Sequence, residues 1–490
     1  MRGSGILMHI TSLPSPYGVG TLGREAYQFI DFLRAAGQRY WQILPVTPTG
    51  YGDSPYQSCS TYAGNHYLID LDMLVEQGLL NRDEVESVCW QDVPERANFG
   101  RLYENRLRVL RLAYNRFQAT DDFDAFCDQN GYWLWDFALF MALKDRNGGA
   151  PWYHWEDPLK FRDPVALETA RQELQEEIRF YCFVQYLFDG QWRALRAYAH
   201  QAGISIIGDV PIYVVYDSAD VWGQPQMFCL DENMTPTAVA GCPPDCFNAD
   251  GQLWGNPLYR WDVHTAENFS WWVRRMAAAG QRYDVVRLDH FRGFESYWAV
   301  PFGDPTARGG QWIPGPGMDF VNAMKTQLPH VKVIAEDLGL LTQEVRDLQK
   351  NSGYPGMKVL GFAFESLEPS EYLLHAHREN TVCYTGTHDN MTTRQWFDTA
   401  APELKDYARN YLRITPQEGD VWGFIRGAMS SVSELCIVPM QDYLELGGES
   451  RMNFPGTQTG DNWTWRAKPG YLYEGLSQRI YDLTRLYGRL

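Results

Sequence analysis

The chain has 490 residues, of which 45% are hydrophobic and 21% are charged, and these fractions are typical of a folded globular protein. The formal net charge of −18 argues against nucleic acid as a partner, because binding to a phosphate backbone needs clustered Lys and Arg. The nine cysteines have no disulfide-type spacing, so we expect a reducing compartment, the cytoplasm. No stretch approaches the roughly 20 apolar residues of a membrane span, and we expect neither a signal peptide nor a membrane partner.

Aromatic residues make up 14% of the chain, with 18 Trp and 29 Tyr. Buried cores rely mainly on Leu, Ile and Val, whereas aromatic faces can stack on the C–H faces of sugar rings. The composition therefore favours a carbohydrate ligand.

Short β-rich runs alternate with helical segments, which is the pattern of a parallel sheet built from βα units. Apolar residues follow a helical spacing from Ala26 to Leu33, and Gly37 can end that helix before the next strand. Similar helices are predicted before Gly203 and Gly280. The predicted strands are 5–10, 41–46, 204–209, 285–289, 331–336, 357–362, 381–386 and 435–440. Eight parallel strands close a (β/α)8 TIM barrel, an α/β fold.

Two segments, roughly 48–185 and 210–268, are too long to be loops and must contain secondary structure of their own. The first has helical patterns, and the second is rich in Pro, Gly, Asp and Trp. No repeat of fixed period, low-complexity tract or flexible linker is found. We therefore expect a single catalytic barrel over 1–490, with helical and loop insertions at its C-terminal face.

Three predicted strands end in carboxylates: VVRLDHF contains Arg287 and Asp289, VIAEDLG contains Glu336, and YTGTHDN contains His388 and Asp389. Side chains at these strand ends point into one mouth of a barrel. Cleavage of a glycosidic bond with retention needs a carboxylate nucleophile and a protonated acid about 5–5.5 Å apart. Burial would keep the acid protonated, and a neighbouring arginine would keep the nucleophile ionised. Taken singly, each acid fits a loop cap or an ion pair better; taken together, they favour catalysis.

The motifs VRLDHFRG, IAEDLG and THDN resemble the catalytic regions of the amylomaltases, the 4-α-glucanotransferases of glycoside hydrolase family 77. Other segments share the resemblance, which spans nearly the whole chain: SGILMHITSLPSPYG, TGYGDSPYQS, GDVPIYV, DSADVW, PPDCFNADGQLWGNPLY and RMNFPGT. The resemblance implies transfer of α-1,4-glucan segments from a donor maltooligosaccharide to an acceptor sugar by a retaining double displacement.

The resemblance also implies roles for the strand-end residues. Asp289 would be the nucleophile, Glu336 the general acid/base, and Asp389 a third carboxylate that stabilises the transition state. Arg287 and His388 would contact the sugar or the nucleophile.

Further residues match sugar-contacting positions of the family. Ser54 and Tyr56 lie in the Gly/Pro-rich segment after the second strand; nearby, Tyr51 fits a secondary glucan site or a plain turn residue equally well. For Asp209, a polar role beneath the sugar competes evenly with a structural hydrogen bond. A loop over the acceptor side would contribute Phe247, Trp254 and Asn256, although Cys246 stands where the family commonly has an aromatic residue.

Two other patterns are set aside. Gly18, Gly20 and Gly23 spell GxGxxG, but LPSPY separates the strand from the first glycine, and the next strand lacks the acidic residue of a dinucleotide site. Cys242 and Cys246 have two prolines between them and no second cysteine pair, so we expect no zinc site. With no calcium-loop spacing either, we expect no metal and no cofactor.

Water and a sugar hydroxyl can both attack the same intermediate. Aromatic insertions over the mouth would exclude water and position an acceptor, which favours transfer. An α-amylase-like hydrolase is the alternative enzyme. A non-catalytic glucan-binding barrel is a further alternative, against which the intact carboxylate set argues.

Overall fold

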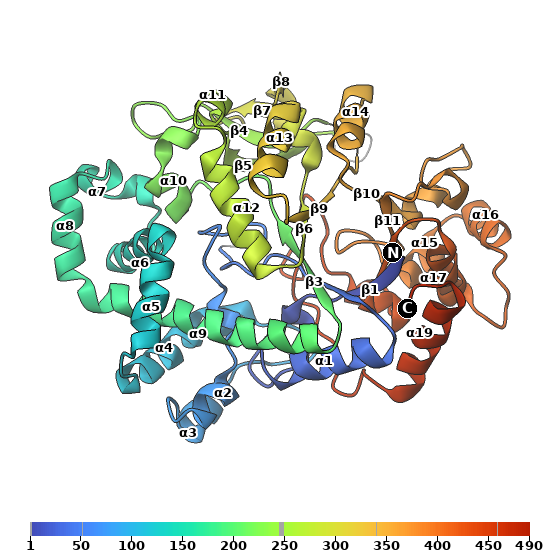
Figure 1. Ribbon diagram of the computed structural model, residues 1–490, viewed down its shortest axis with the longest axis horizontal. Helices are drawn as coiled ribbons and strands as arrows, with labels where there is room; N and C mark the ends of the chain where they lie inside the picture. The colour runs from blue at the N-terminus through green and yellow to red at the C-terminus, as the bar shows by residue number, and fades with distance from the viewer. Residues whose placement is uncertain (1, 51, 245–248, 340, 458) are drawn as a thin grey trace.

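The computed structural model describes residues 2–50, 52–244, 249–339, 341–457 and 459–490 (Figure 1). Eight parallel strands form a closed barrel in the order β1-β12-β11-β10-β9-β6-β3-β2. These are β1 (Gly3–Leu7), β2 (Tyr40–Gln42), β3 (Ser205–Val210), β6 (Val285–Leu288), β9 (Lys332–Ala335), β10 (Gly356–Val359), β11 (Thr381–Tyr384) and β12 (Leu435–Pro439). Each strand overlaps a predicted one, and the predicted (β/α)8 barrel is confirmed.

The barrel closes because its strands pack tightly on both sides. All five residues of β1 are buried, and a Cβ atom on Gly5 would lie 2.5 Å from the Tyr40 carbonyl oxygen, so only glycine fits there. Inside the barrel the Tyr384 hydroxyl donates to Gln42 Oε1 at 2.9 Å. The two ends of the chain meet beside β1, where Arg489 Nη1 donates to the Gly3 carbonyl oxygen at 3.0 Å (Figure 1).

Helices occupy most of the segment between β2 and β3. They are α2 (Leu71–Glu76), α3 (Arg82–Glu86), α4 (Phe99–Arg116), α5 (Asp121–Gln129), α6 (Gly131–Arg146), α7 (Asp157–Lys160), α8 (Pro164–Glu173) and α9 (Gln175–Gln201). Several of them gather at one end of the molecule, away from the C-terminal helices (Figure 1).

The remaining helices are α1 (Arg24–Ala35), α10 (Ala219–Gly223), α11 (Trp261–Ala266), α12 (Ser270–Arg282), α13 (Gly317–Gln327), α14 (Gln343–Ser352), α15 (Thr393–Thr399), α16 (Pro402–Leu412), α17 (Asp420–Ser430), α18 (Met440–Tyr443) and α19 (Glu474–Leu486). None of the helices in the described ranges has the length and apolar character needed to cross a membrane.

A second, antiparallel sheet was not predicted. Its strands, in the order β5-β4-β7-β8, are β4 (Ala238–Cys242), β5 (Gln252–Pro257), β7 (Ser296–Pro301) and β8 (Gln311–Pro314). The sheet joins the segment after β3 to the segment after β6, and no strand was predicted in either segment. It carries Trp254 and Asn256, so it builds part of the region above the barrel strands.

Candidate active site

A buried arginine links two carboxylates on neighbouring strands. Asp209 and Arg287 are register partners on β3 and β6, and Asp289 follows β6 directly. Arg287 Nη1 lies 2.6 Å from Asp209 Oδ2 and 2.9 Å from Asp289 Oδ1. Arg287 and Asp209 are almost fully buried, whereas the Asp289 side chain is 27% exposed. The arginine therefore pairs with both carboxylates while the Asp289 side chain stays accessible.

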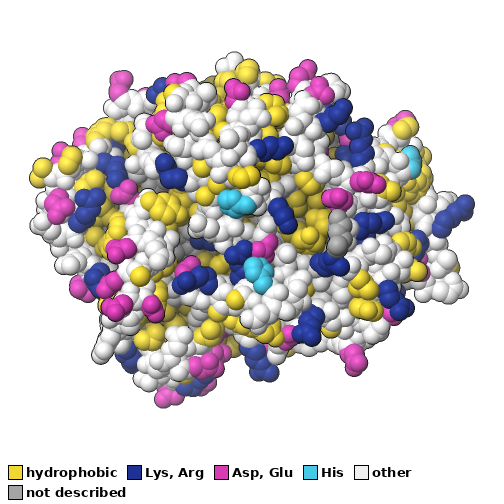
Figure 2. All heavy atoms as spheres, viewed as in Figure 1, with side chains coloured by type: hydrophobic (Ala, Val, Ile, Leu, Met, Phe, Trp, Pro, Cys, Tyr) yellow, Lys and Arg dark blue, Asp and Glu magenta, His cyan; other side chains and the backbone are white. Residues whose placement is uncertain are grey.

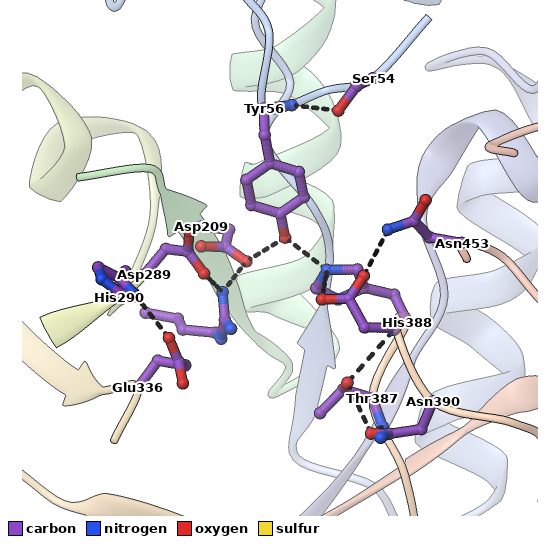
Figure 3. A network of polar contacts seen from close by, with 12 residues as sticks. Ser54, Tyr56, Asp209, Asp289, His290, Glu336, Thr387, His388, Asn390 and Asn453 are labelled. Atoms are coloured by element: carbon purple, nitrogen blue, oxygen red, sulfur yellow. Dashed lines mark hydrogen bonds and ion pairs between the residues drawn. The ribbon is translucent and has the colours of Figure 1, made fainter. Parts of the chain in front are cut away.

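A left-handed turn connects Asp289 to Glu336. His290 has a φ of 51°, so the chain turns sharply after β6 into a short 3-10 helix. In this turn the His290 backbone N–H donates to Glu336 Oε2 at 2.7 Å, and the Leu338 N–H donates to Glu336 Oε1 at 2.7 Å. Glu336 directly follows β9, the neighbour of β6 in the barrel. The turn thus brings the second carboxyl group next to the residue that follows Asp289 (Figure 3).

Tyr56 connects this group to the seventh barrel strand, β11. Its hydroxyl donates to Asp209 Oδ2 at 2.8 Å and lies 3.0 Å from His388 Nε2 (Figure 3). The Tyr56 ring also stacks on the His388 ring, with centroids 5.3 Å apart and an interplanar angle of 17°. Trp463 packs beside both rings, and its ring centroid lies 5.9 Å from that of Tyr56 and 6.0 Å from that of His388. These rings form an aromatic wall next to the carboxylates.

Asp389 lies on the other side of His388. Its carboxylate is 3.4 Å from His388 Nε2 and accepts a hydrogen bond of 2.7 Å from Asn453 Nδ2 (Figure 3). Arg451 Nη2 donates to the Asp389 carbonyl oxygen at 2.7 Å. The Asp389 side chain is 42% exposed, so it is the most open carboxylate of the group.

Burial shifts the titration of these groups. Burial, with a further contribution from the Asp289 charge, raises the pKa of Glu336 to about 7, although Arg287 opposes the shift. Burial lowers the pKa of His290 to about 4 and also lowers the pKa of His388. These shifts favour the uncharged form of both histidines and the protonated form of Glu336.

One buried acceptor in this group is unused. Asp209 Oδ1 has no hydrogen-bond partner within the described part of the chain, while Oδ2 is shared by Arg287 and Tyr56. A buried carboxylate oxygen without a donor is unusual.

The second sheet reaches the same region. The Trp254 ring lies 4.9 Å from the His290 ring, and Asn256 follows two residues later on β5 and is 5% exposed. Ser54 is further from the carboxylates: its hydroxyl accepts the Tyr56 N–H at 3.3 Å (Figure 3). Phe247, Tyr51 and Cys246 lie outside the described residues.

Gly20 and Gly23 of the GxGxxG pattern pack closely against other parts of the chain. A Cβ atom on Gly20 would lie 1.9 Å from the Ile10 carbonyl oxygen, and one on Gly23 would lie 2.0 Å from the Asp70 carboxylate. Within the described residues no cluster of three or more His, Cys, Asp or Glu could hold a metal ion.

Three contributors were not assigned from the sequence. Asn453 and Arg451 belong to the RMNFPGT segment, which had been noted for its resemblance but given no role. Trp463 follows that segment. No local pattern links these residues to a strand end 62 or more residues earlier. The family resemblance of RMNFPGT was therefore the signal that could have placed them in the site.

A closed barrel with paired carboxylates at its strand ends is the arrangement of an enzyme that acts on glycosidic bonds. The model of the 4-alpha-glucanotransferase family, glycoside hydrolase family 77, matches residues 8–472. The chain is 48% identical to the 4-alpha-glucanotransferase of Clostridium butyricum, over 98% of this chain and all of the relative. It is also 48% identical to that of Thermus thermophilus, over 100% of this chain and 99% of the relative.

The structure is similar to that of the amylomaltase from Streptococcus agalactiae in complex with acarbose. The TM-score is 0.97 at 42% identity, and both chains are covered completely. The protein belongs to the 4-alpha-glucanotransferase family, and the predicted family and enzyme class are confirmed.

Proposed function

We propose that this 4-α-glucanotransferase transfers α-1,4-glucan segments between maltooligosaccharides by a retaining double displacement. The observation that carries the proposal is the contrast between two neighbouring carboxyl groups. Asp289 lies 2.9 Å from the Arg287 guanidinium, whereas Glu336 is buried and has a pKa raised to about 7. Such a division into an ionised carboxylate and a protonated acid is what retaining cleavage requires.

In the first step the Asp289 carboxylate attacks the anomeric carbon of the donor. The bond from that carbon to the glycosidic oxygen breaks, and Glu336 gives its proton to the departing oxygen. The donor segment is then esterified to Asp289, and Glu336 is ionised. The partly exposed Asp289 side chain can reach a sugar that enters from the mouth of the barrel.

In the second step Glu336 takes the proton of an acceptor hydroxyl. The acceptor oxygen attacks the anomeric carbon, and the bond to Asp289 breaks, so the original configuration returns. Asp389, with one oxygen held by Asn453 at 2.7 Å, would bind donor hydroxyls and stabilise the positive charge of the transition state. His388 Nε2, which lies 3.4 Å from the Asp389 carboxylate, would provide a further polar contact.

Transfer is favoured over hydrolysis by the cover of the site. Tyr56, Trp463 and Trp254 surround the carboxylates with aromatic rings, which exclude water and offer a surface for an acceptor sugar. The donors and acceptors we propose are maltooligosaccharides and other α-1,4-glucans. Relatives that share the full length of the chain are named 4-alpha-glucanotransferases, which supports this choice over a hydrolase.

The expectations for the whole chain are part of this proposal. One catalytic unit spans 1–490, with insertions at 48–185 and 210–268, and it works without a cofactor in the cytoplasm. Nucleic acid is not a proposed partner: acidic and basic side chains are interspersed on the face in Figure 2, and the net charge is −18.

Incubation with maltotriose tests the proposal. A transferase produces glucose and longer maltooligosaccharides at a nearly constant number of reducing ends, because each bond cleaved is replaced by one formed. A steady rise in reducing ends without longer chains would show the hydrolase instead. Binding of maltooligosaccharides without transfer or hydrolysis would support the alternative of a non-catalytic glucan-binding barrel.

A further inference from the structure

A buried carboxylate lies beside the loop that carries His388 and Asp389. Asp442 belongs to the short helix α18, which directly follows β12, and it is only 1% exposed. The mechanism proposed above gives it no part. Because a carboxylate is costly to bury unless its oxygens accept hydrogen bonds, the partners of Asp442 indicate its task.

Asp442 holds both ends of this loop. Its Oδ2 accepts hydrogen bonds from the Thr385 hydroxyl at 2.6 Å and the Thr393 hydroxyl at 2.8 Å, and its Oδ1 accepts the Thr393 backbone N–H at 2.7 Å. Thr385 is the first residue after β11, and Thr393 is the first residue of α15. One side chain therefore closes the base of residues 385–393, which we call the Asp389 loop.

These hydrogen bonds are not needed to start α15. Thr392, the residue before the helix, already accepts the Gln395 N–H at 3.1 Å with its own hydroxyl, which is an ordinary N-cap. Burial raises the pKa of Asp442, and the hydrogen bonds from Thr385 and Thr393 oppose that rise. The remaining task of these bonds is to join the end of β11 to the start of α15.

The interior of the Asp389 loop transmits this constraint to Asp389. Asn390 Oδ1 accepts the Thr387 N–H at 2.8 Å and the Thr387 hydroxyl at 2.9 Å (Figure 3). The Asp389 N–H in turn donates to the Thr387 hydroxyl at 3.3 Å. Local bonds of this kind stiffen a turn, so fixing its two ends also fixes the backbone of Asp389.

The same helix contacts the outer support of Asp389. Gln441, also on α18, donates through its side-chain amide to the Ser450 carbonyl oxygen at 3.3 Å. Ser450 precedes Arg451, whose Nη2 donates to the Asp389 carbonyl oxygen at 2.7 Å. Helix α18 therefore contacts the Asp389 loop through one residue and the segment that supports Asp389 through the residue before it.

We propose that Asp442 is a positioning residue for the reaction, because its carboxylate fixes the Asp389 loop in the arrangement in which Asp389 meets the donor sugar at Asp289. The inference rests on the proposed function, in which Asp389 stabilises the positive charge of the transition state. A charge with this task must be held in place before the reaction, since reorienting it at each turnover would raise the barrier. Asp442 acts only through the loop.

The test measures kcat and KM with maltotriose, and urea unfolding gives the folded fraction of each variant. In Asp442→Ala we expect kcat to fall about 30- to 100-fold and KM to change no more than about threefold, because the loss concerns a group that acts in the transition state. Asp442→Asn keeps an acceptor for the Thr393 N–H, so its kcat should be about tenfold higher than that of Asp442→Ala.

Asp70→Ala is the matched control. Asp70 is also a buried carboxylate, and it accepts the Thr21 hydroxyl at 2.6 Å and the N–H of Met73 in helix α2 at 3.0 Å. Its removal should lower stability and leave kcat of the folded protein unchanged. A fall in kcat as large as that of Asp442→Ala would show that the loss of any such buried carboxylate damages the enzyme, and it would overturn the proposal.

A double-mutant cycle separates positioning from general damage. Asp389→Asn should itself lower kcat, which is measured with an activated glucosyl donor so that the residual rate is detectable. If Asp442 acts through Asp389, adding Asp442→Ala to Asp389→Asn should cost no more than about a further twofold. Damage to the fold would lower the rate by the same factor in both backgrounds, and that result would contradict a positioning role.

Thr385→Val keeps the test decisive if Asp442→Ala does not fold. It removes one hydroxyl that donates to Asp442 and keeps a similar shape, so we expect kcat to fall about three- to tenfold; Thr385→Ser keeps the hydroxyl and should retain the wild-type kcat. An unchanged kcat in Thr385→Val would overturn the positioning role and leave the transferase intact. If the wild-type protein fails to disproportionate maltotriose, the proposed function fails, and the role of Asp442 fails with it.

Discussion

The proposed catalytic groups at the strand ends and the aromatic cover above them are built in different ways. Asp209, Arg287 and Asp289 are fixed by the register of two adjacent strands, and they contact one another directly. Trp254 and Phe302 belong to the second sheet or follow it, and they contribute ring faces instead of paired charges. The strand-end region is held by ion pairs, whereas the cover presents aromatic ring surfaces.

This difference assigns separate tasks to the two regions. In the proposed mechanism the strand-end groups provide the nucleophile and the acid, which water and a sugar acceptor would use equally. In that mechanism the choice between water and sugar depends on the cover, which would exclude water and bind the acceptor. Changes at the strand ends should stop the reaction, and changes in the cover should redirect it.

The largest effect is expected for Asp289→Ala. Without a nucleophile the double displacement cannot begin, so we expect transfer to fall by about 10⁴-fold or more. Folding should change little, because the side chain is 27% exposed and Arg287 keeps Asp209 at 2.6 Å. Maltotriose disproportionation and urea unfolding provide the two measurements. Asp398→Ala, at an exposed acid on α15, is the control, and near-wild-type activity of Asp289→Ala would remove the mechanism.

A somewhat smaller loss, roughly 10²- to 10⁴-fold, is expected for Glu336→Gln with natural donors. An activated donor needs little acid assistance, so it should leave a covalent sugar that peptide mapping locates on Asp289. A label on any other residue would contradict the assignment of the nucleophile.

The raised pKa of Glu336 also predicts the pH dependence. Since the acid must be protonated for the first step, kcat/KM of the wild type should fall as the pH rises through about 7. Folded protein binds this proton more tightly than unfolded protein, whose Glu336 has the ordinary value of 4.5, so the contribution to stability is lost between about pH 4.5 and 7. Glu336→Gln should lose both dependences. A wild-type kcat/KM that stays constant from pH 6 to 8 would show that Glu336 is not the acid.

Tyr56→Phe should lower kcat about tenfold to hundredfold. The change removes a hydroxyl that donates to the buried Asp209 at 2.8 Å and contacts His388, but it keeps the ring that stacks on His388. KM should therefore change much less than kcat. Tyr471→Phe is the control, because its buried hydroxyl has no hydrogen-bond partner among the described residues. Equal kcat values for the two variants would exclude a role of the Tyr56 hydroxyl.

The strand-end region was also the more predictable one from the sequence. A short buried strand followed by a charged pair is a local pattern, so VVRLDHF, VIAEDLG and YTGTHDN revealed both the barrel strands and their carboxylates. Two-residue spacing placed Arg287 and Asp289 on one face, and their side chains are in contact. The spacing could not show that Arg287 also pairs with Asp209, since that contact depends on which strands are neighbours.

The cover was predicted less completely, because its contacts join distant segments. In the second sheet Ala238 pairs with Pro301, and no local pattern announces a partner so far along the chain. The hydrogen bond from Asn453 to Asp389 spans 64 residues and was missed for the same reason. The aromatic composition favoured a carbohydrate ligand, but only the structure brings Tyr153, Tyr216 and Phe302 together.

The smallest effect, and the most specific test of the cover, is expected for Trp254→Ala. The Trp254 ring contacts His290 beside the acid, and its removal should take away a stacking surface of about 1 kcal/mol and admit water. Transfer should then fall about fivefold more than hydrolysis, because water needs no aromatic surface to bind. The ratio of new reducing ends to longer chains, measured with maltotriose, reports this partition directly. Trp135→Ala on α6, at a tryptophan that is 41% exposed, should leave the ratio unchanged. If Trp254→Ala slows both reactions by the same factor, Trp254 supports the site as a whole, and the assignment of acceptor choice to the cover would be wrong.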